Sequence, residues 1–309
     1  MKGPLFFSKI LLFGEYGIIK DSKGLSIPYN FYKGALKLSD KNSDFALKSN
    51  NNLKGFYHYL KKINPSIVNF DFDKFYTDIK SGIYFDSTIP EGYGVGSSGA
   101  LVAAIYDSYS INKITVLENL TRDKLLKLKK IFSLMESFFH GKSSGLDPLN
   151  SYLSIPILIN SKDDIKATGI PSQLRFGKGA VFLLDSGEVS TTAPMINIFM
   201  EKMKKEGFRK MLNNQFIKYT NKCVDDFLNG DLASLFSNTK SLSKVVLDNF
   251  KPMIPVKYHE LWKKGIENDS FFLKLCGSGG GGYILGFTQD INKAKKDLKG
   301  HKLEIVYNF

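Results

Sequence analysis

The sequence is poor in cysteine and has no long hydrophobic run. Cys223 and Cys276 are its only cysteines in 309 residues, and no Cys or His pair has the spacing of a zinc site. This excludes a disulfide framework and gives no support to a structural metal. The apolar run after Pro4 is interrupted by Lys9, so we expect neither a signal sequence nor a membrane span, and we expect a cytoplasmic protein.

Arginine is also scarce, although the chain is strongly basic. The net charge is +13, yet of 43 basic residues only Arg122, Arg175 and Arg209 are arginines, and the lysines are scattered among 30 acidic residues. Arginine reads base edges and stacks on bases, so its scarcity argues against sequence-specific binding of nucleic acid. We therefore expect no nucleic-acid partner and interpret the charge as a solvated surface, or as mild attraction for a small anionic molecule.

Length and hydrophobic pattern predict two domains built from both helices and strands. A chain of 309 residues is long enough to divide, and we place the domains at 1–177 and 178–309. Short apolar runs predict strands, and apolar residues at helical spacing predict helices. The expected strands cover 6–13, 34–38, 82–86, 178–185, 271–275, 282–287 and 302–307. The expected helices cover 53–62, 101–106, 123–139, 195–212, 214–228, 231–248 and 256–268.

A turn rich in glycine and serine connects the strand at 82–86 to the apolar helix at 101–106. Its residues are Gly94-Val95-Gly96-Ser97-Ser98-Gly99. A helix N-terminus offers unpaired backbone N–H groups and the positive end of the helix dipole, and glycine lets phosphate oxygens approach the main chain. The turn is therefore a candidate phosphate-binding loop. Taken alone, it is more simply interpreted as a tight, serine-capped connection.

A second run of glycines, Gly277-Ser278-Gly279-Gly280-Gly281-Gly282, lies between two apolar strands. A hairpin turn does not require so many glycines, and each one costs backbone entropy on folding. The flanking strands are apolar and should be rigid, which argues against a merely flexible loop. The run predicts main chain packed against a ligand.

A third segment, His140-Gly141-Lys142-Ser143-Ser144-Gly145-Leu146-Asp147-Pro148, follows the helix at 123–139, in which Glu136 lies at the edge of the apolar stripe. Taken alone, Asp147 is a turn residue before proline and Lys9 a strand-edge lysine facing solvent. These segments, together with the early run Lys9-Ile-Leu-Leu-Phe-Gly14-Glu15-Tyr16, resemble the GHMP small-molecule kinases. The resemblance follows the order of the chain from Lys9 to Gly282.

Within this superfamily the residues are most similar to those of the mevalonate kinases. Lys9 stands where galactokinases have arginine, and homoserine kinases lack the counterpart of Asp147. Gly282 continues a glycine run that phosphomevalonate kinases usually break with an acid. Phe13 and Tyr16 depart from the pattern, because each replaces a histidine of the mevalonate kinases beside the expected acceptor.

The resemblance implies an α+β protein of two domains, a ribosomal-protein-like first domain and a ferredoxin-like second domain, with the nucleotide at the domain interface. It implies a kinase that uses ATP and Mg²⁺ to phosphorylate the primary hydroxyl of mevalonate in isoprenoid precursor synthesis. The alternatives are another activity of the superfamily, on phosphomevalonate or a sugar, and a non-catalytic sensor that binds ATP or a metabolite. The expected partner is a small-molecule alcohol, and a homodimer stays open.

The resemblance also implies roles for single residues. Asp147 would accept or orient the proton of the acceptor hydroxyl, Lys9 would stabilise Asp147 and the γ-phosphate, and Ser98 with Glu136 would hold Mg²⁺. The implied nucleotide-binding residues are Gly94, Val95, Gly96, Ser97, Ser98, Gly99, Gly277, Ser278, Gly279 and Gly280. The implied acceptor contacts are Glu15, Tyr16 and His140, with a surface salt bridge as the alternative for Glu15.

Overall fold

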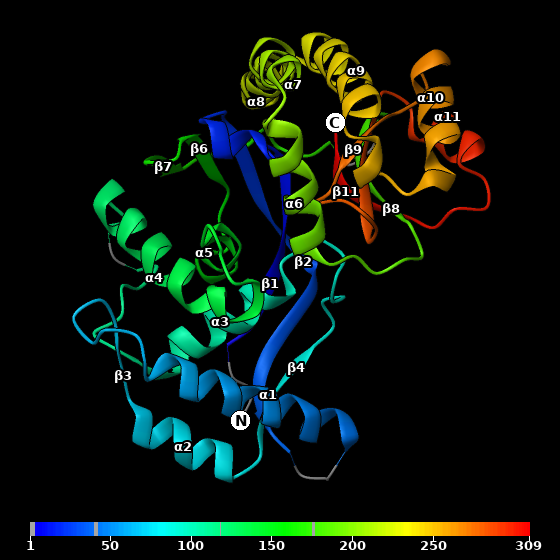
Figure 1. Ribbon diagram of the computed structural model, residues 1–309. Coiled ribbons are helices and arrows are strands. Elements are labelled where there is room, and N and C mark those ends of the chain that lie inside the picture. The colour runs from blue at the N-terminus through cyan, green and yellow to red at the C-terminus, as the bar shows by residue number, and fades with distance from the viewer. Residues whose placement is uncertain (1–3, 40–42, 118, 175–176) are drawn as a thin grey trace. The chain divides into compact units, whose positions relative to one another are not determined.

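The computed structural model of the chain (Figure 1) describes residues 4–39, 43–117, 119–174 and 177–309. The chain forms two compact units and passes between them several times. The described residues of Met1–Lys9, Ile27–Pro90 and Gly96–Ile155 form the first unit, and Ile10–Ser26, Glu91–Val95 and Pro156–Phe309 form the second. These units do not coincide with the segments 1–177 and 178–309, whose division into domains stays a prediction.

The first unit is mainly helical. Its helices are α1 (Asp44–Leu60), α2 (Phe72–Lys80), α3 (Ser97–Tyr109), α4 (Arg122–His140) and α5 (Leu146–Leu153), and its short strands are β3 (Asn69–Phe70), β4 (Ile83–Ser87) and β5 (Ser110–Ile111). β4 pairs antiparallel with the second half of β2 (Gly24–Leu38), and α1 packs on β4. α3 packs against both α4 and α5, and α1 lies beside α2 (Figure 1).

Local sequence explains where the helices of the first unit begin. Ser43 caps α1 and Thr121 caps α4, because each side chain accepts a hydrogen bond from a backbone N–H in the first turn. α4 buries the predicted apolar stripe from Leu125 to Met135, and Glu136 is buried with it, whereas Phe138 at the end of the stripe is exposed. α1 begins well before the predicted residue 53. Asn50, in this earlier part of the helix, is buried and donates hydrogen bonds to the carbonyls of Ile79 and Ile83.

The second unit contains a four-stranded antiparallel sheet in the order β11 (Leu303–Asn308), β8 (Ala180–Asp185), β10 (Tyr283–Thr288), β9 (Phe272–Leu275). α9 (Leu232–Asn249) packs on β9 and β10, beside α8 (Lys218–Asn229) and α10 (His259–Glu267) (Figure 1). A hairpin of β6 (Ile157–Ser161) and β7 (Asp164–Ala167) pairs with the start of β2. β1 (Phe6–Phe13) contributes residues to both units.

The remaining helices of the second unit differ from the pattern in the sequence. The predicted helix at 195–212 is two helices, α6 (Thr192–Met203) and α7 (Glu206–Met211), because the backbone becomes extended at Lys205. A π-helical turn, Leu212–Ile217, joins α7 to α8, and α11 (Ile291–Asp297) was not expected. The predicted mixture of helices and strands is confirmed as an α+β fold. In the described part of the chain, no helix is long and apolar enough to cross a membrane.

Candidate active site

The turn before α3 is shaped by glycines that have a left-handed backbone. Gly96 is the N-cap of α3 with a φ of 85°, a conformation that favours glycine. A Cβ on Gly96 would lie 3.1 Å from Cγ of Lys9 and 3.8 Å from Oδ2 of Asp147. A Cβ on Gly99 would lie 2.7 Å from the carbonyl carbon of Asp147. The N-terminus of α3 therefore packs directly against Lys9 and Asp147, and glycine is required for this approach.

Lys9 and Asp147 form an ion pair in the first unit. The distance from Nζ of Lys9 to Oδ1 of Asp147 is 2.9 Å, and the two side chains are 4% and 37% exposed. The interpretation of Lys9 as a lysine that faces solvent is therefore wrong. Asp147 lies in the first turn of α5, where the positive end of the helix dipole favours a carboxylate. A buried ammonium thus holds a carboxylate that solvent still reaches.

Glu136 lies in the same unit and is held by two serine hydroxyls. Oε1 accepts a hydrogen bond of 3.0 Å from Ser98 Oγ, and Oε2 accepts one from Ser143 Oγ. Ser98 Oγ also lies 3.0 Å from Nε2 of His140. Burial, aided by the charge of Asp147, raises the pKa of Glu136 to about 7, and the two hydroxyls and Lys9 oppose this shift. Burial within this cluster thus favours the neutral form of Glu136.

The oxygen atoms around Ser98 and Glu136 suit a magnesium nucleotide. Among the described residues, no group of three or more His, Cys, Asp and Glu side chains could hold a metal by itself. Mg²⁺ usually takes one or two carboxylates and completes its shell with phosphate oxygens and water. A single buried carboxylate beside a serine hydroxyl at a helix N-terminus fits that mode of binding.

In the second unit, the glycine run after β9 packs against the backbone of the segment Glu91–Val95. A Cβ on Gly94 would lie 2.5 Å from the carbonyl oxygen of Cys276, and one on Gly282 would lie 2.5 Å from Cα of Tyr93. The hydroxyl of Ser190 donates a 2.6 Å hydrogen bond to the carbonyl of Gly279. The run is thus an ordered loop whose glycines allow main chain to contact main chain.

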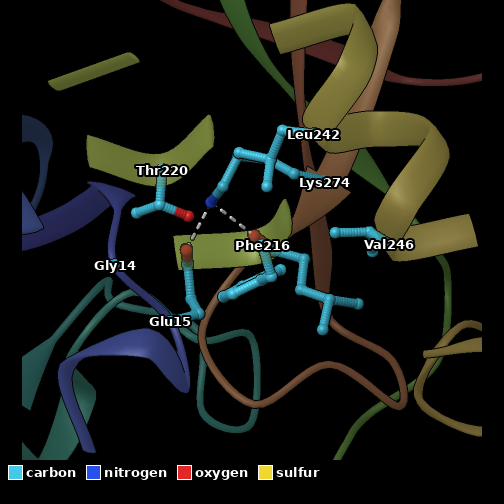
Figure 2. Close-up of a pocket in the computed structure, with 8 residues that line it drawn as sticks. Gly14, Glu15, Phe216, Thr220, Leu242, Val246 and Lys274 are labelled. Atoms are coloured by element: carbon cyan, nitrogen blue, oxygen red, sulfur yellow. Dashed lines mark hydrogen bonds and ion pairs between the residues drawn. The ribbon is translucent and has the colours of Figure 1, made fainter. Parts of the chain in front are cut away.

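Glu15 and Tyr16 follow β1 and lie in the second unit. Glu15 is buried, and its Oε1 is 2.5 Å from Nζ of Lys274, which is also buried (Figure 2). The alternative of a surface salt bridge for Glu15 is therefore wrong, because the pair is internal. Tyr16 stacks on Phe199 and donates a 2.7 Å hydrogen bond to the carbonyl of Ser278. Burial, aided by the charge of Glu15, raises the pKa of Tyr16 above its usual range.

Three polar side chains of these clusters were not anticipated from the sequence. Ser143 holds Glu136, Ser190 holds the glycine loop, and Lys274 pairs with Glu15. Ser190 lies just before α6, whose N-cap, Thr191, makes no side-chain hydrogen bond. Lys274 offered the same signal as Lys9, a single lysine inside an apolar strand.

The predicted site residues thus fall into two clusters, each described within its own unit. The first contains Lys9, Gly96, Ser97, Ser98, Gly99, Glu136, His140 and Asp147, and the second contains Glu15, Tyr16, Gly94, Val95, Gly277, Ser278, Gly279 and Gly280. The turn before α3 belongs to both, since Val95 ends one segment and Gly96 begins the next.

Comparison with known proteins relates this arrangement to one family. Residues 52–154 match the model of the GHMP kinases N terminal domain. This segment includes the glycine turn, Glu136 and Asp147, and it lacks Lys9 and the glycine loop at 277–282. No curated protein matches the sequence.

Solved structures of several GHMP kinases have a similar fold. L. major mevalonate kinase in complex with R-mevalonate has a TM-score of 0.64 and 15% identity over 97% of this chain and 94% of that one. Streptococcus pneumoniae phosphomevalonate kinase in complex with phosphomevalonate and AMPPNP has a TM-score of 0.61 and 14% identity, over 99% of this chain and 100% of that one. Lactococcus lactis galactokinase complexed with galactose has a TM-score of 0.61 and 13% identity, over 98% of this chain and 93% of that one.

At these identities the solved structures establish the fold alone, and the family model matches only residues 52–154. Residues 52–154 thus resemble a GHMP kinase N-terminal domain, and the predicted resemblance of the chain to the GHMP kinase superfamily, with a fold like that of mevalonate kinase, is confirmed.

Proposed function

We propose that the protein transfers the γ-phosphoryl group of ATP to the hydroxyl of a small alcohol. The observation that carries the proposal is the ion pair of Lys9 and Asp147, which packs against Gly96 at the start of α3. A base, a cation and a helix N-terminus are what phosphoryl transfer to an alcohol needs, since the chemistry depends on positioning and charge neutralisation.

Asp147 is the proposed base. As the acceptor oxygen bonds to the γ-phosphorus and the bond to the β-phosphate oxygen breaks, the hydroxyl proton passes to the Asp147 carboxylate. Its 37% exposure leaves room for an acceptor, whereas Lys9, at 4%, is enclosed. Lys9 keeps Asp147 in position and adds positive charge beside the transferred group. The backbone N–H groups of Ser97 and Ser98, which begin α3, bind phosphate oxygens.

Ser98 and Glu136 are the proposed magnesium ligands. The ion, when bound with ATP, would neutralise charge on the β- and γ-phosphates. The chain's own contribution is to hold two oxygen atoms together, because Ser98 Oγ and Glu136 Oε1 are 3.0 Å apart, and to fix Glu136 from its other side through Ser143. Nucleotide contacts by Gly94, Val95 and Gly277–Gly280 stay a prediction, as do acceptor contacts by Glu15, Tyr16 and His140.

Mevalonate is the acceptor that we propose, at its primary hydroxyl. The support is the combination of Lys9, Asp147 and an unbroken glycine run up to Gly282, which resembles the mevalonate kinases, together with a fold similar to that of a mevalonate kinase. The fold alone does not select this acceptor, because phosphomevalonate kinase and galactokinase are similar to the chain at comparable TM-scores.

The test is release of ADP from Mg·ATP with mevalonate, phosphomevalonate, galactose or homoserine offered separately. Turnover with mevalonate that is lost in Asp147→Asn supports both the reaction and the base. The matched control is Asp107→Asn, because Asp107 also pairs with a lysine of the first unit, Lys113, at 2.7 Å but lies near the C-terminal end of α3, at the opposite end from Gly96. The control should keep the activity of the wild type.

The other outcomes are equally informative. Turnover with another acceptor would retain the kinase and replace mevalonate. Full activity of Asp147→Asn would overturn the assigned base. Binding of ATP without turnover on any of the four acceptors would favour a sensor over these kinases, and absence of ATP binding would contradict the proposed function altogether.

A further inference from the structure

A small cavity lies next to the turn that follows β1, inside the second unit. Figure 2 shows that Glu15, Thr220 and Lys274 direct polar atoms toward one point, while apolar walls come from Phe216, Leu242 and Val246. The space open to the centre of a water molecule is about 10 Å³. That is about the room that one buried water requires, and it is too small for an organic ligand.

Thr220 is the first sign that the cavity is occupied. The residue is 1% exposed, and its Oγ1 has no hydrogen-bond partner in the described part of the chain. A buried hydroxyl without a partner is costly, and buried polar groups in folded proteins are nearly always satisfied by protein or by ordered water. In Figure 2 this oxygen points toward the ammonium group of Lys274.

Lys274 gives a second, independent sign. An ammonium group has three N–H donors. Two of them are used in hydrogen bonds, at 2.5 Å to Oε1 of Glu15 and 2.8 Å to the carbonyl of Leu275. A third donor therefore remains for the cavity, next to a carboxylate that can accept more than one hydrogen bond. The cavity thus combines a donor, an acceptor and a hydroxyl that can do either.

We propose that this cavity is a binding site for one structural water molecule. The water accepts a hydrogen bond from Nζ of Lys274, exchanges one with Oγ1 of Thr220 and donates one to the carboxylate of Glu15. Three partners are the usual number for a buried water. A cation would be repelled by Lys274, an anion by Glu15, and an apolar atom would leave Thr220 unsatisfied. The water links the turn after β1 to α8 and β9, whatever reaction the protein catalyses.

The variant Thr220→Val tests the proposal through the sign of its effect on stability. Valine has nearly the shape of threonine and removes only the hydroxyl. If the water is present, the variant takes away one of its partners, and the urea midpoint falls below that of the wild type. If the cavity is empty, the variant removes an unsatisfied hydroxyl, and the midpoint rises. A rise would overturn the proposal.

Ser270→Ala is the matched control. Ser270 Oγ is likewise buried and without a partner among the described residues, but Ser270 does not line this cavity. Its removal should leave the midpoint unchanged or raise it. A crystal structure gives the second measurement. Solvent density within hydrogen-bond distance of Thr220, Lys274 and Glu15, kept in Thr220→Ser, supports the proposal, and a well-ordered but empty cavity contradicts it.

Discussion

Two lysines of this chain occupy similar places in the sequence but different environments in the fold. Lys9 lies in β1 and Lys274 in β9, each a single lysine within an apolar strand, and each is buried against a carboxylate. Asp147, the partner of Lys9, is 37% exposed, whereas Glu15, the partner of Lys274, is 5% exposed. Only the first pair presents a charged oxygen that a substrate could reach.

The comparison teaches that burial of the lysine does not by itself mark a catalytic site. A buried ion pair loses much of its Coulombic gain to desolvation, so it needs further hydrogen bonds around it. Lys274 has the carbonyl of Leu275 and the proposed water for this purpose. Lys9 lies beside Gly96 and the start of α3, which are suited to phosphate. We therefore propose a catalytic role for the first pair and, for the second, a structural role in fixing the turn after β1.

Removal of the exposed carboxylate is the strongest test of this difference between the two ion pairs. Asp147→Asn should lower kcat by about 10²- to 10⁴-fold, the usual contribution of a general base. Its effect on the free energy of unfolding should be small, because the side chain is partly solvated. Steady-state kinetics and urea denaturation of the same preparations measure both quantities. If the variant is fully active, or if its main defect is a lower free energy of unfolding, Asp147 is a structural residue like Glu15.

The second pair should respond in the opposite way. Lys274→Met leaves the Glu15 carboxylate buried without its cation, and breaking such a pair costs roughly 3–5 kcal/mol of stability. The control is Lys23→Met, because Lys23 pairs with Asp225 in the same unit but both side chains are substantially exposed. That loss should be at most about 1 kcal/mol. Equal losses from the two variants in urea denaturation would contradict the distinction between buried and exposed pairs.

The sequence was sufficient for the elements whose pattern is strong. β1, β8 and the apolar stripe of α4 have the predicted positions, and the segments around Gly96 and Asp147 do meet in the first unit. What joins distant segments could not be predicted, because a partner far along the chain leaves no local pattern. Lys274 is 259 residues from Glu15, and its apolar neighbours fit an ordinary buried strand. Asn50 is a second case, since its two acceptors, the carbonyls of Ile79 and Ile83, lie outside its own helix.

Glu136 provides a third test, through pH. Its pKa is raised from 4.5 to about 7, first by burial and then by Asp147. A carboxyl with a raised pKa binds its proton more tightly in the folded state, so this contribution to stability is present below about pH 4.5 and is lost as the pH rises toward 7. Glu136→Gln should remove this part of the dependence of the free energy of unfolding on pH, which is worth on the order of a few kcal/mol. Unfolding measured between pH 4.5 and 8 in both proteins checks this, and parallel curves would refute it.

The smallest expected effect concerns Tyr16, which connects the structural pair to the predicted nucleotide loop. Tyr16→Phe removes the hydrogen bond to the carbonyl of Ser278 and keeps the stacking on Phe199, at a cost of about 1 kcal/mol. If the loop contacts ATP, the KM for ATP should rise while kcat changes little, because the base and the cation are untouched. Tyr307→Phe is the control, since that hydroxyl also donates to a backbone carbonyl, of Pro171, outside the loop. It should lose similar stability without a change in KM, and a rise in both variants would show that the loop has no special dependence on Tyr16.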